Sequence, residues 1–208
     1  MKDLQQLDLQ RLTSDAGKFT RRYWGREPHL LRQAFSPTET LLDPNRVARV
    51  LGGRALRPPY IRVVKQGRNV PPEKWTRATP IAQGLSPDAA VADRLLSELR
   101  EGATIVLDAY EDHDAEIRSA CRALGRELRC PVHGVIFITP PGEEGFSLHM
   151  DNKDVFVVQL AGTKRWRVYS QLIPVPDIGQ SLPNMDPGPP VIDTLLQTQG
   201  FVKVGCGV

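Results

Sequence analysis

Apolar residues at helical spacing mark two segments in the first 128 residues. One stripe recurs every four residues before Gly102, and it predicts a helix that begins near Ser86-Pro87-Asp88. A second stripe predicts an amphipathic helix over about 114–128. Shorter helices are expected around 15–24 and 44–51, and strands at 30–35, 60–65 and 104–109. Residues 1–101 are therefore predicted to form a mainly helical part with some strands.

From residue 132 the pattern changes to short apolar runs separated by turn residues. The runs lie at 132–139, 147–150, 155–160, 164–169 and 191–197, with Pro140-Pro141-Gly142 and Ala161-Gly162-Thr163 between some of them. This pattern predicts an all-β barrel or double sheet over 102–208. Residues 170–208 are rich in proline and low in charge, so they are predicted to be a loop with a degenerate end.

Composition adds few constraints. The chain has 208 residues and a formal net charge of +3, with 40% hydrophobic and 25% charged residues, as in ordinary globular domains. The slight positive charge does not favour nucleic acid or a membrane as partner. No apolar run is long enough to cross a membrane, and the first residues lack a signal-peptide centre, so we expect a soluble cytoplasmic protein. The three cysteines have no zinc or disulfide spacing.

The candidate chemistry lies in His149-Met150-Asp151. Side chains at positions i and i+2 of a strand point to the same face, so the imidazole and the carboxylate can converge on one metal ion. Mixed nitrogen and oxygen ligands suit a first-row metal. A His-x-Asp triplet also arises often by chance in a chain with four histidines, so the pair alone does not identify a site.

The surrounding segment is more specific. Gly145-Phe146-Ser147-Leu148-His149-Met150-Asp151 leads into 154–169, which ends in Lys164-Arg165-Trp166-Arg167-Val168-Tyr169. This segment resembles the JmjC-type cupins, in particular the ribosomal-oxygenase-like branch of the Fe(II)/2-oxoglutarate dioxygenases. The resemblance covers about 132–169, and the segment 23–32 also looks like the amino-terminal part of that family.

The resemblance implies an α+β fold: a double-stranded β-helix of the cupin or jelly-roll type behind a mainly helical amino-terminal part. It also implies Fe(II) held by two histidines and one carboxylate, with 2-oxoglutarate as cosubstrate. His149 and Asp151 would be the proximal metal ligands, and Lys164 would bind the distal carboxylate of 2-oxoglutarate. The open alternative for Lys164 is that it simply reaches solvent beside a turn, as most lysines do.

The chain departs from the family pattern at two places. Related oxygenases often carry asparagine and tyrosine where this chain has Val135 and Phe137, so two side chains that could hydrogen-bond to 2-oxoglutarate are absent. The family also places a distal histidine on a later strand, but no histidine follows His149. The remaining candidates for a third ligand are Asp154, Asp177, Asp186, Asp193 and Cys206. We therefore expect truncation or a frame shift near Gln197, and a barrel that is incomplete at the carboxyl end.

The leading hypothesis is a JmjC-type Fe(II)/2-oxoglutarate hydroxylase, inactive if the third ligand is absent, which acts on a protein side chain or peptide-like substrate such as a ribosomal protein. The alternative is a non-catalytic cupin-like binding or scaffold protein. A third class, RNA or ribosome binding without catalysis, would need salt-sensitive association that the net charge does not indicate. The oligomeric state has no signal in the sequence.

Overall fold

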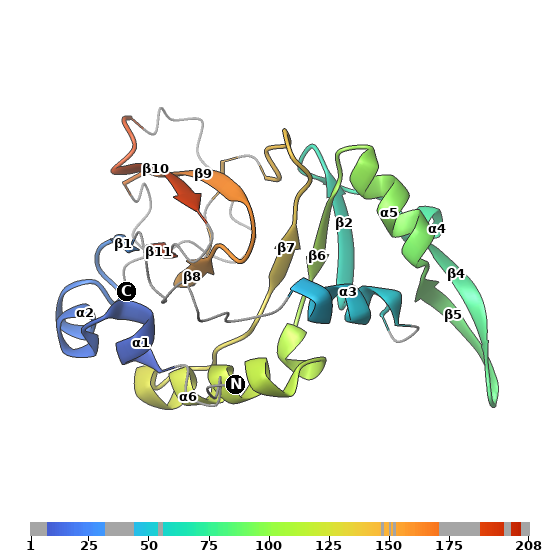
Figure 1. Ribbon diagram of the computed structural model, residues 1–208, viewed down its shortest axis with the longest axis horizontal. Coiled ribbons are helices and arrows are strands. Elements are labelled where there is room, and N and C mark those ends of the chain that lie inside the picture. Colours follow the sequence, from blue (N-terminus) through green and yellow to red (C-terminus); the bar gives the residue numbers. More distant parts are fainter. Residues whose placement is uncertain are drawn as a thin grey trace. The chain divides into compact units, whose positions relative to one another are not determined.

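The computed structural model describes residues 8–31, 44–53, 56–146, 148–149, 151, 153–170, 188–197 and 201–204. The chain contains both helices and antiparallel strands (Figure 1), which confirms the α+β class. The described residues fall into two compact units. Unit 1 holds those from 44 to 146, and unit 2 holds 8–31 together with those from 148 to 204. The predicted division of the sequence at 101/102 remains a prediction.

Unit 1 is built on a four-stranded antiparallel sheet of order β3-β2-β6-β7. Its strands are β2 (Ile61–Lys65), β3 (Arg68–Asn69), β6 (Thr104–Leu107) and β7 (Ile136–Ile138). All four residues of β6 are buried, because this central strand has a neighbour on each side. Ile61 pairs with Leu107 at one end of the β2–β6 ladder, and both side chains are fully buried. The predicted strand at 104–109 is confirmed for 104–107.

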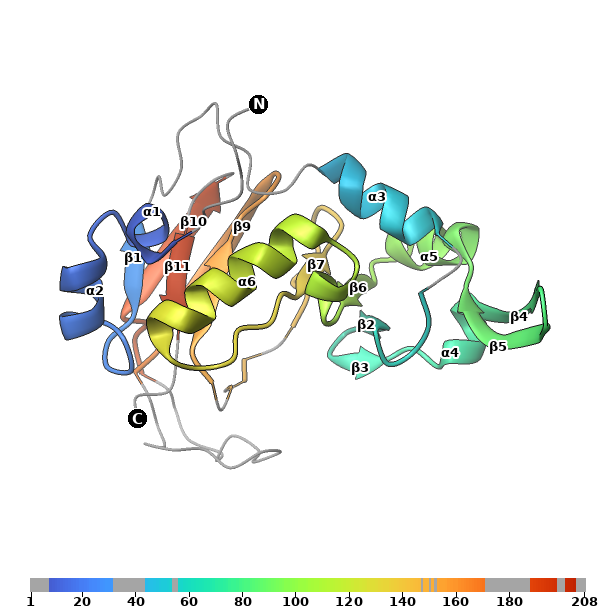
Figure 2. The same cartoon turned by 90° about the horizontal axis from the view of Figure 1, so that it is seen from below.

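A two-stranded ribbon forms the second sheet of unit 1. It consists of β4 (Thr76–Ile81) and β5 (Gly84–Ala90) and extends away from the rest of the unit in Figure 2. The predicted helix start at Ser86-Pro87-Asp88 is wrong, because these residues lie in β5 and pair with β4. The helix α5 begins six residues later and spans Ala92–Arg100. The ladder to β4 overrides the local signal for a helix start.

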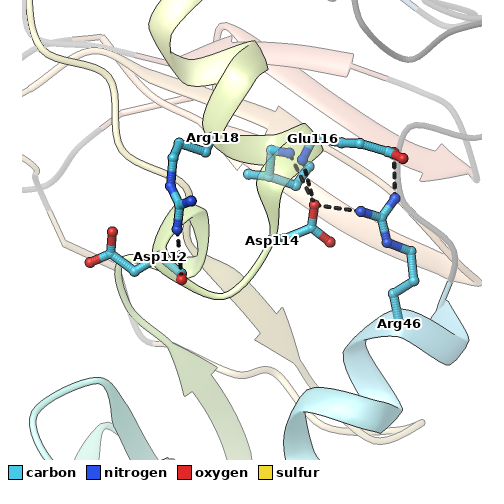
Figure 3. Close-up of polar contacts among 6 residues, drawn as sticks. Arg46, Asp112, Asp114, Glu116 and Arg118 are labelled. Carbon is cyan, nitrogen blue, oxygen red and sulfur yellow. Dashed lines mark hydrogen bonds and ion pairs between the residues drawn. The ribbon is translucent and has the colours of Figure 1, made fainter.

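The remaining helices of unit 1 are α3 (Pro44–Gly52), α4 (Pro72–Trp75) and α6 (Ala115–Leu128), with a short 3-10 turn, η2 (Tyr110–Asp112). Asp114 caps α6, since its Oδ1 accepts bonds from the backbone N–H groups of Glu116 and Ile117. Arg46 on α3 bonds to Asp114 at 2.5 Å and to Glu116, as Figure 3 shows. The predicted helix over 114–128 is thus confirmed, and its start is tied to α3.

Unit 2 contains two small antiparallel sheets. The first has the order β1-β11-β8 and consists of β1 (His29–Leu31), β11 (Phe201–Val204) and β8 (Val155–Val158). The second pairs β9 (Thr163–Val168) with β10 (Ile192–Gln197). Two short helices, α1 (Leu9–Thr13) and α2 (Ala16–Arg22), precede β1, and Asp15 caps α2.

A hydrophobic cluster joins the two sheets of unit 2. Its buried centre is Val168 on β9 and Leu196 on β10. Residues from both sheets pack against this centre: Leu30, Val157, Trp166 and Ile192. The inner faces of the two sheets therefore share one core, which is the arrangement expected of a double sheet.

The prediction that 170–208 is loop with a degenerate end is partly wrong. Residues 192–197 form β10, which had been considered as one strand, but Phe201–Val204 also form a strand, β11, between β1 and β8. This strand was not predicted, because the segment is only four residues long, includes Lys203 and is flanked by glycines. Residues 171–187, 198–200 and 205–208 lie outside the described residues.

Candidate metal and cosubstrate site

His149 and Asp151 lie just before β8. The structure brings the pair together, with 3.9 Å between His149 Nε2 and Asp151 Oδ2. Both side chains are well exposed, at 57% and 48%. The predicted strand over 147–150 is wrong for Leu148 and His149, which have no strand hydrogen bonding. Gly145 has a positive φ of 86°, which turns the chain, and Leu148 is half exposed and so provides no buried face for a strand.

The spacing of the two donor atoms suits a shared metal ion. A first-row ion bonded to nitrogen and oxygen at about 2.0 to 2.2 Å can bridge donors up to roughly 4 Å apart. The observed 3.9 Å lies within that span and exceeds hydrogen-bond length, so the imidazole and carboxylate are not locked to each other. Among the described residues no group of three His, Cys, Asp or Glu side chains is placed to hold an ion. The pair therefore fits a metal as two of its ligands.

Of the five candidates for a third metal ligand, the structure describes two, Asp154 and Asp193. Asp193 lies on the exposed face of β10, and its carboxylate receives two bonds from Arg165, at 2.8 and 2.7 Å. This pairing lowers the pKa of Asp193 and holds it away from the inner face. Asp154 is half-buried at the start of β8. Asp177, Asp186 and Cys206 lie outside the described residues.

Lys164 lies on β9 in the predicted phase. Lys164, Trp166 and Val168 are the less exposed residues of this strand, whereas Arg165 and Arg167 are exposed. The Lys164 ammonium lies 5.8 Å from the centroid of the Trp166 ring. Burial lowers the pKa of Lys164, because a half-buried ammonium loses hydration. A cation held on the inner face of a sheet fits an anionic ligand, which would compensate for this loss.

The two positions that lack the family's polar residues lie on β7 and the residue before it, in unit 1. Val135 and Phe137 are 40% and 53% exposed. The Phe137 ring contacts that of Phe146 edge-on, with 5.6 Å between the centroids. Neither side chain carries a hydrogen-bonding group, so these two positions cannot donate a side-chain hydrogen bond to 2-oxoglutarate.

The other three histidines have structural contacts. His29 stacks on Tyr23 with 4.0 Å between the ring centroids, and burial, together with Lys18 and Arg22, lowers its pKa. His113 meets the Tyr60 ring edge-on. His133 Nδ1 lies 2.8 Å from Glu111 Oε1. None of these contacts joins a second imidazole to the pair at 149 and 151.

Comparison with known proteins places this geometry in a family context. Residues 110–200 match the model of the JmjC domain. This part of the chain is therefore similar to the JmjC domain. The resemblance inferred from the segment 145–169 is thereby confirmed, since the matched range includes His149, Asp151 and Lys164.

Curated relatives share short stretches with this chain. The bifunctional lysine-specific demethylase and histidyl-hydroxylase NO66 of Drosophila persimilis is 28% identical over 119 residues, which are 56% of this chain and 17% of that protein. Ribosomal oxygenase 1 of Homo sapiens is 41% identical over 66 residues, which are 30% of this chain and 10% of that protein. The chain therefore spans a small part of the length of these relatives.

Solved structures show the same fold. YcfD, a ribosomal oxygenase from Escherichia coli in complex with cobalt and 2-oxoglutarate, matches with a TM-score of 0.60 at 21% identity. The match covers 94% of this chain and 47% of that one. The cobalt and succinic acid complex of YcfD gives a TM-score of 0.61 at 20% identity, over 94% of this chain and 47% of that chain. The predicted cupin-type, JmjC-like fold is confirmed by these likenesses.

One feature of this site was missed by sequence reasoning. The indole Nε1 of Trp166 is buried and has no hydrogen-bond partner among the described residues. The sequence indicated only that Trp166 shares a face with Lys164. It carried no sign that the indole donor would lack an acceptor, because that depends on the packing of the two sheets.

Proposed function

We propose that this JmjC domain belongs to an Fe(II)/2-oxoglutarate-dependent hydroxylase that acts on a protein side chain or a peptide-like substrate. The observation that carries the proposal is the convergence of His149 Nε2 and Asp151 Oδ2 to 3.9 Å directly before β8. The names of the relatives, histidyl-hydroxylase and ribosomal oxygenase, support it. So does the complex of YcfD with cobalt and 2-oxoglutarate.

In this proposal His149 and Asp151 provide two of the metal's ligands, and Lys164 pairs with the distal carboxylate of 2-oxoglutarate. When bound, the iron and 2-oxoglutarate supply the activation of O2. One oxygen atom enters a C–H bond of the substrate as a hydroxyl group. The other enters succinate as 2-oxoglutarate loses CO2 and is oxidised. The chain's own part is to orient the metal, the cosubstrate and the substrate.

The substrate class follows from the relatives. Ribosomal oxygenases recur among them, so we propose a ribosomal protein as substrate. A cytoplasmic location is part of the same proposal. Within the described part of the chain, no helix combines the length and apolar character needed to cross a membrane. Hydroxylation of isolated ribosomal proteins, read by a mass increase of one oxygen atom, would identify the substrate.

A non-catalytic cupin-like binding or scaffold protein is the second candidate. The observation that favours it is that the described residues offer the metal only the pair at 149 and 151. Two protein ligands hold a metal less firmly than three, because each lost ligand removes one bond that competes with water. Such a protein would keep the double sheet and the Lys164 cation without supporting turnover.

Anaerobic addition of Fe(II) and 2-oxoglutarate to the whole chain separates the two candidates. The hydroxylase predicts a weak metal-to-ligand charge-transfer band, and succinate release once O2 is admitted. His149→Ala and Asp151→Ala should abolish both signals. His133→Ala is the matched control, since this histidine is also exposed but pairs with Glu111. A chain that gives neither band nor succinate, and that binds no Fe(II) in calorimetry, would be the scaffold.

A further inference from the structure

Three arginines lie along one side of α6 at a constant interval. This arginine row consists of Arg118, Arg122 and Arg126, which stand four residues apart. Side chains at this spacing lie above one another on a helix, about 6 Å apart along its axis. Arg122 and Arg126 are exposed, and Arg118 is half-buried. A fourth arginine, Arg129, is exposed at the carboxyl-terminal cap of the same helix.

The apolar side of α6 lies opposite the arginine row. The buried residues of the helix also recur at intervals of four: Ala120, Leu124 and Leu128. Each of them is two residues from a member of the row, and two residues are about 200° apart around a helix. The row is therefore directed away from the core that α6 helps to form.

No carboxylate in the described part of the chain forms an ion pair with the arginine row. Arg118 Nη2 donates to the backbone carbonyl of Asp112 at 2.8 Å, and Figure 3 shows the Asp112 carboxylate pointing away from this guanidinium. Asp114, four residues before Arg118, bonds to Arg46 instead. Neither acid within α6 stands three or four residues from the row, the spacing at which side chains on a helix meet.

This arrangement of charges is unfavourable for the isolated fold. Like charges four residues apart on a helix repel each other, and the arginine row contains two such pairs. Arg118 also lies in the first turn of α6, where the helix dipole disfavours a cation. Within the row, Arg126 alone lies in the last turn, where the dipole favours it. An anionic polymer bound along the row would remove the repulsion, so the row fits a ligand better than it fits the fold.

The composition of α6 indicates what kind of polymer this is. Guanidinium groups match phosphate in a bidentate manner, and a regular interval suits a chain that carries one anion in every unit. The helix has no aromatic residue on which a base could stack, which disfavours single-stranded nucleic acid. It also has no exposed large apolar side chain to insert into a bilayer. These features favour the phosphate backbone of a nucleic-acid duplex.

We propose that the arginine row of α6 binds the phosphate backbone of duplex RNA, independently of base sequence. The choice of RNA rests on the proposed function, in which the substrate is a ribosomal protein, because ribosomal proteins are assembled on RNA. The net charge of +3 does not reveal such a surface, since acids elsewhere in the chain balance most of its cations.

The test measures binding of a short fluorescent RNA duplex to the whole chain by anisotropy at several salt concentrations. The logarithm of the affinity should fall with the logarithm of the salt concentration with a slope of about −3, one unit for each arginine of the row. The combined variant Arg118→Gln, Arg122→Gln and Arg126→Gln should weaken binding about hundredfold and bring the slope close to zero. The corresponding triple lysine variant should keep the slope, because it keeps the charges.

The matched control removes three exposed arginines from other elements of unit 1. The combined variant Arg68→Gln, Arg77→Gln and Arg100→Gln changes the net charge equally and should alter the affinity less than about threefold. Equal weakening in both glutamine variants would mean that only net charge matters, and would overturn the inference. So would a wild-type chain that binds no duplex, that binds anionic phosphatidylglycerol vesicles instead, or from which polyglutamate displaces the duplex at equal charge.

A stability measurement distinguishes binding from a structural role. Arg122→Gln relieves repulsion from both neighbours in the row, so at low salt its melting temperature should equal or exceed that of the wild type. A lower melting temperature would show that the fold itself uses this arginine, and would overturn the inference.

The proposed function is tested separately by 2-oxoglutarate binding to the chain loaded with Zn(II), a redox-inert substitute for iron. This affinity should be the same in the wild type and in the triple glutamine variant of the row. If the wild type binds duplex RNA through the row but binds no 2-oxoglutarate, the proposed function fails and the inference stands. If it binds 2-oxoglutarate but no RNA duplex, the inference fails and the proposed function stands.

Discussion

Two polar clusters in this protein differ in how far their side chains are exposed to solvent. In unit 1, Asp114 is buried, caps α6 and receives Arg46, which also bonds to Glu116 (Figure 3). In unit 2, His149 and Asp151 are exposed and too far apart for a hydrogen bond. The first cluster uses its bonding capacity inside the fold and stabilises it. The second is open to solvent and so is accessible to a ligand, as functional sites often are.

The largest effect is expected in the buried cluster around Asp114. Asp114→Ala removes a helix cap and leaves the Arg46 guanidinium, whose side chain is 22% exposed, without one of its two carboxylate partners. We expect the free energy of unfolding to fall by about 3 kcal/mol, as measured by urea denaturation followed by circular dichroism. A loss below about 1 kcal/mol would show that Asp114 acts as an ordinary cap and that the pairing with α3 adds nothing.

The next effect concerns the ligand-directed charge. Lys164→Met should weaken 2-oxoglutarate binding about thirtyfold, because a carboxylate loses a charged hydrogen-bond donor. Calorimetry with the zinc-loaded chain measures this. The wild-type affinity should also decline as the pH rises through the lowered pKa of Lys164, at a lower pH than for an ordinary lysine. Equal affinity in both chains would mean that Lys164 is a solvated surface lysine.

Lys164→Met, which should weaken ligand binding, should make the ligand-free protein more stable. Burial lowers the pKa of Lys164, so the folded chain binds this proton less well than the unfolded chain. Lys164→Met therefore raises the melting temperature at pH 7 in the absence of ligand. The stability of the wild type rises with pH between the lowered pKa and the ordinary value near 10.5. The difference in melting temperature between the variant and the wild type should therefore become smaller at alkaline pH. A lower melting temperature for the variant would be the opposite result.

The smallest effect is expected one residue further along β9. Arg165 is exposed and pairs with Asp193 on the outer face. Because water and salt screen such pairs, Arg165→Met should leave the melting temperature and the 2-oxoglutarate affinity unchanged at physiological ionic strength. Arg165→Met is the matched control for Lys164→Met, because the two residues are adjacent on β9 and face opposite ways. A large loss of affinity in Arg165→Met would show that the two faces of β9 have been assigned the wrong way round.

Hydrophobic periodicity predicted those helices and strands whose apolar pattern extends over enough residues to be recognised. The stripe ending at Leu128 gave α6, and the alternation from Lys164 to Val168 gave both the strand and its inner face. In each case the information is local, so the sequence alone carries it. His149 and Asp151 do lie close together, but not for the predicted reason, because no strand forms at these residues.

The failures have a common cause in long-range pairing. Ser86-Pro87-Asp88 is a good helix start, yet the ladder with β4 holds it in a strand. The short run Phe201–Val204 is a strand because β1 and β8 flank it, from positions far away in the chain. The buried indole donor of Trp166 likewise depends on two sheets that meet. None of these pairings is visible in a window of neighbouring residues.

The central claim is that His149 and Asp151 share a metal ion. The four imidazoles of this chain allow that to be measured residue by residue, since His29, His113 and His133 serve as internal controls. Mn(II) added below stoichiometry to the 15N-histidine-labelled chain broadens the resonances of imidazoles within a few ångströms of the ion. The account predicts selective loss of the His149 resonances, abolished by Asp151→Ala. Equal broadening of all four imidazoles, or loss confined to another histidine, would contradict it.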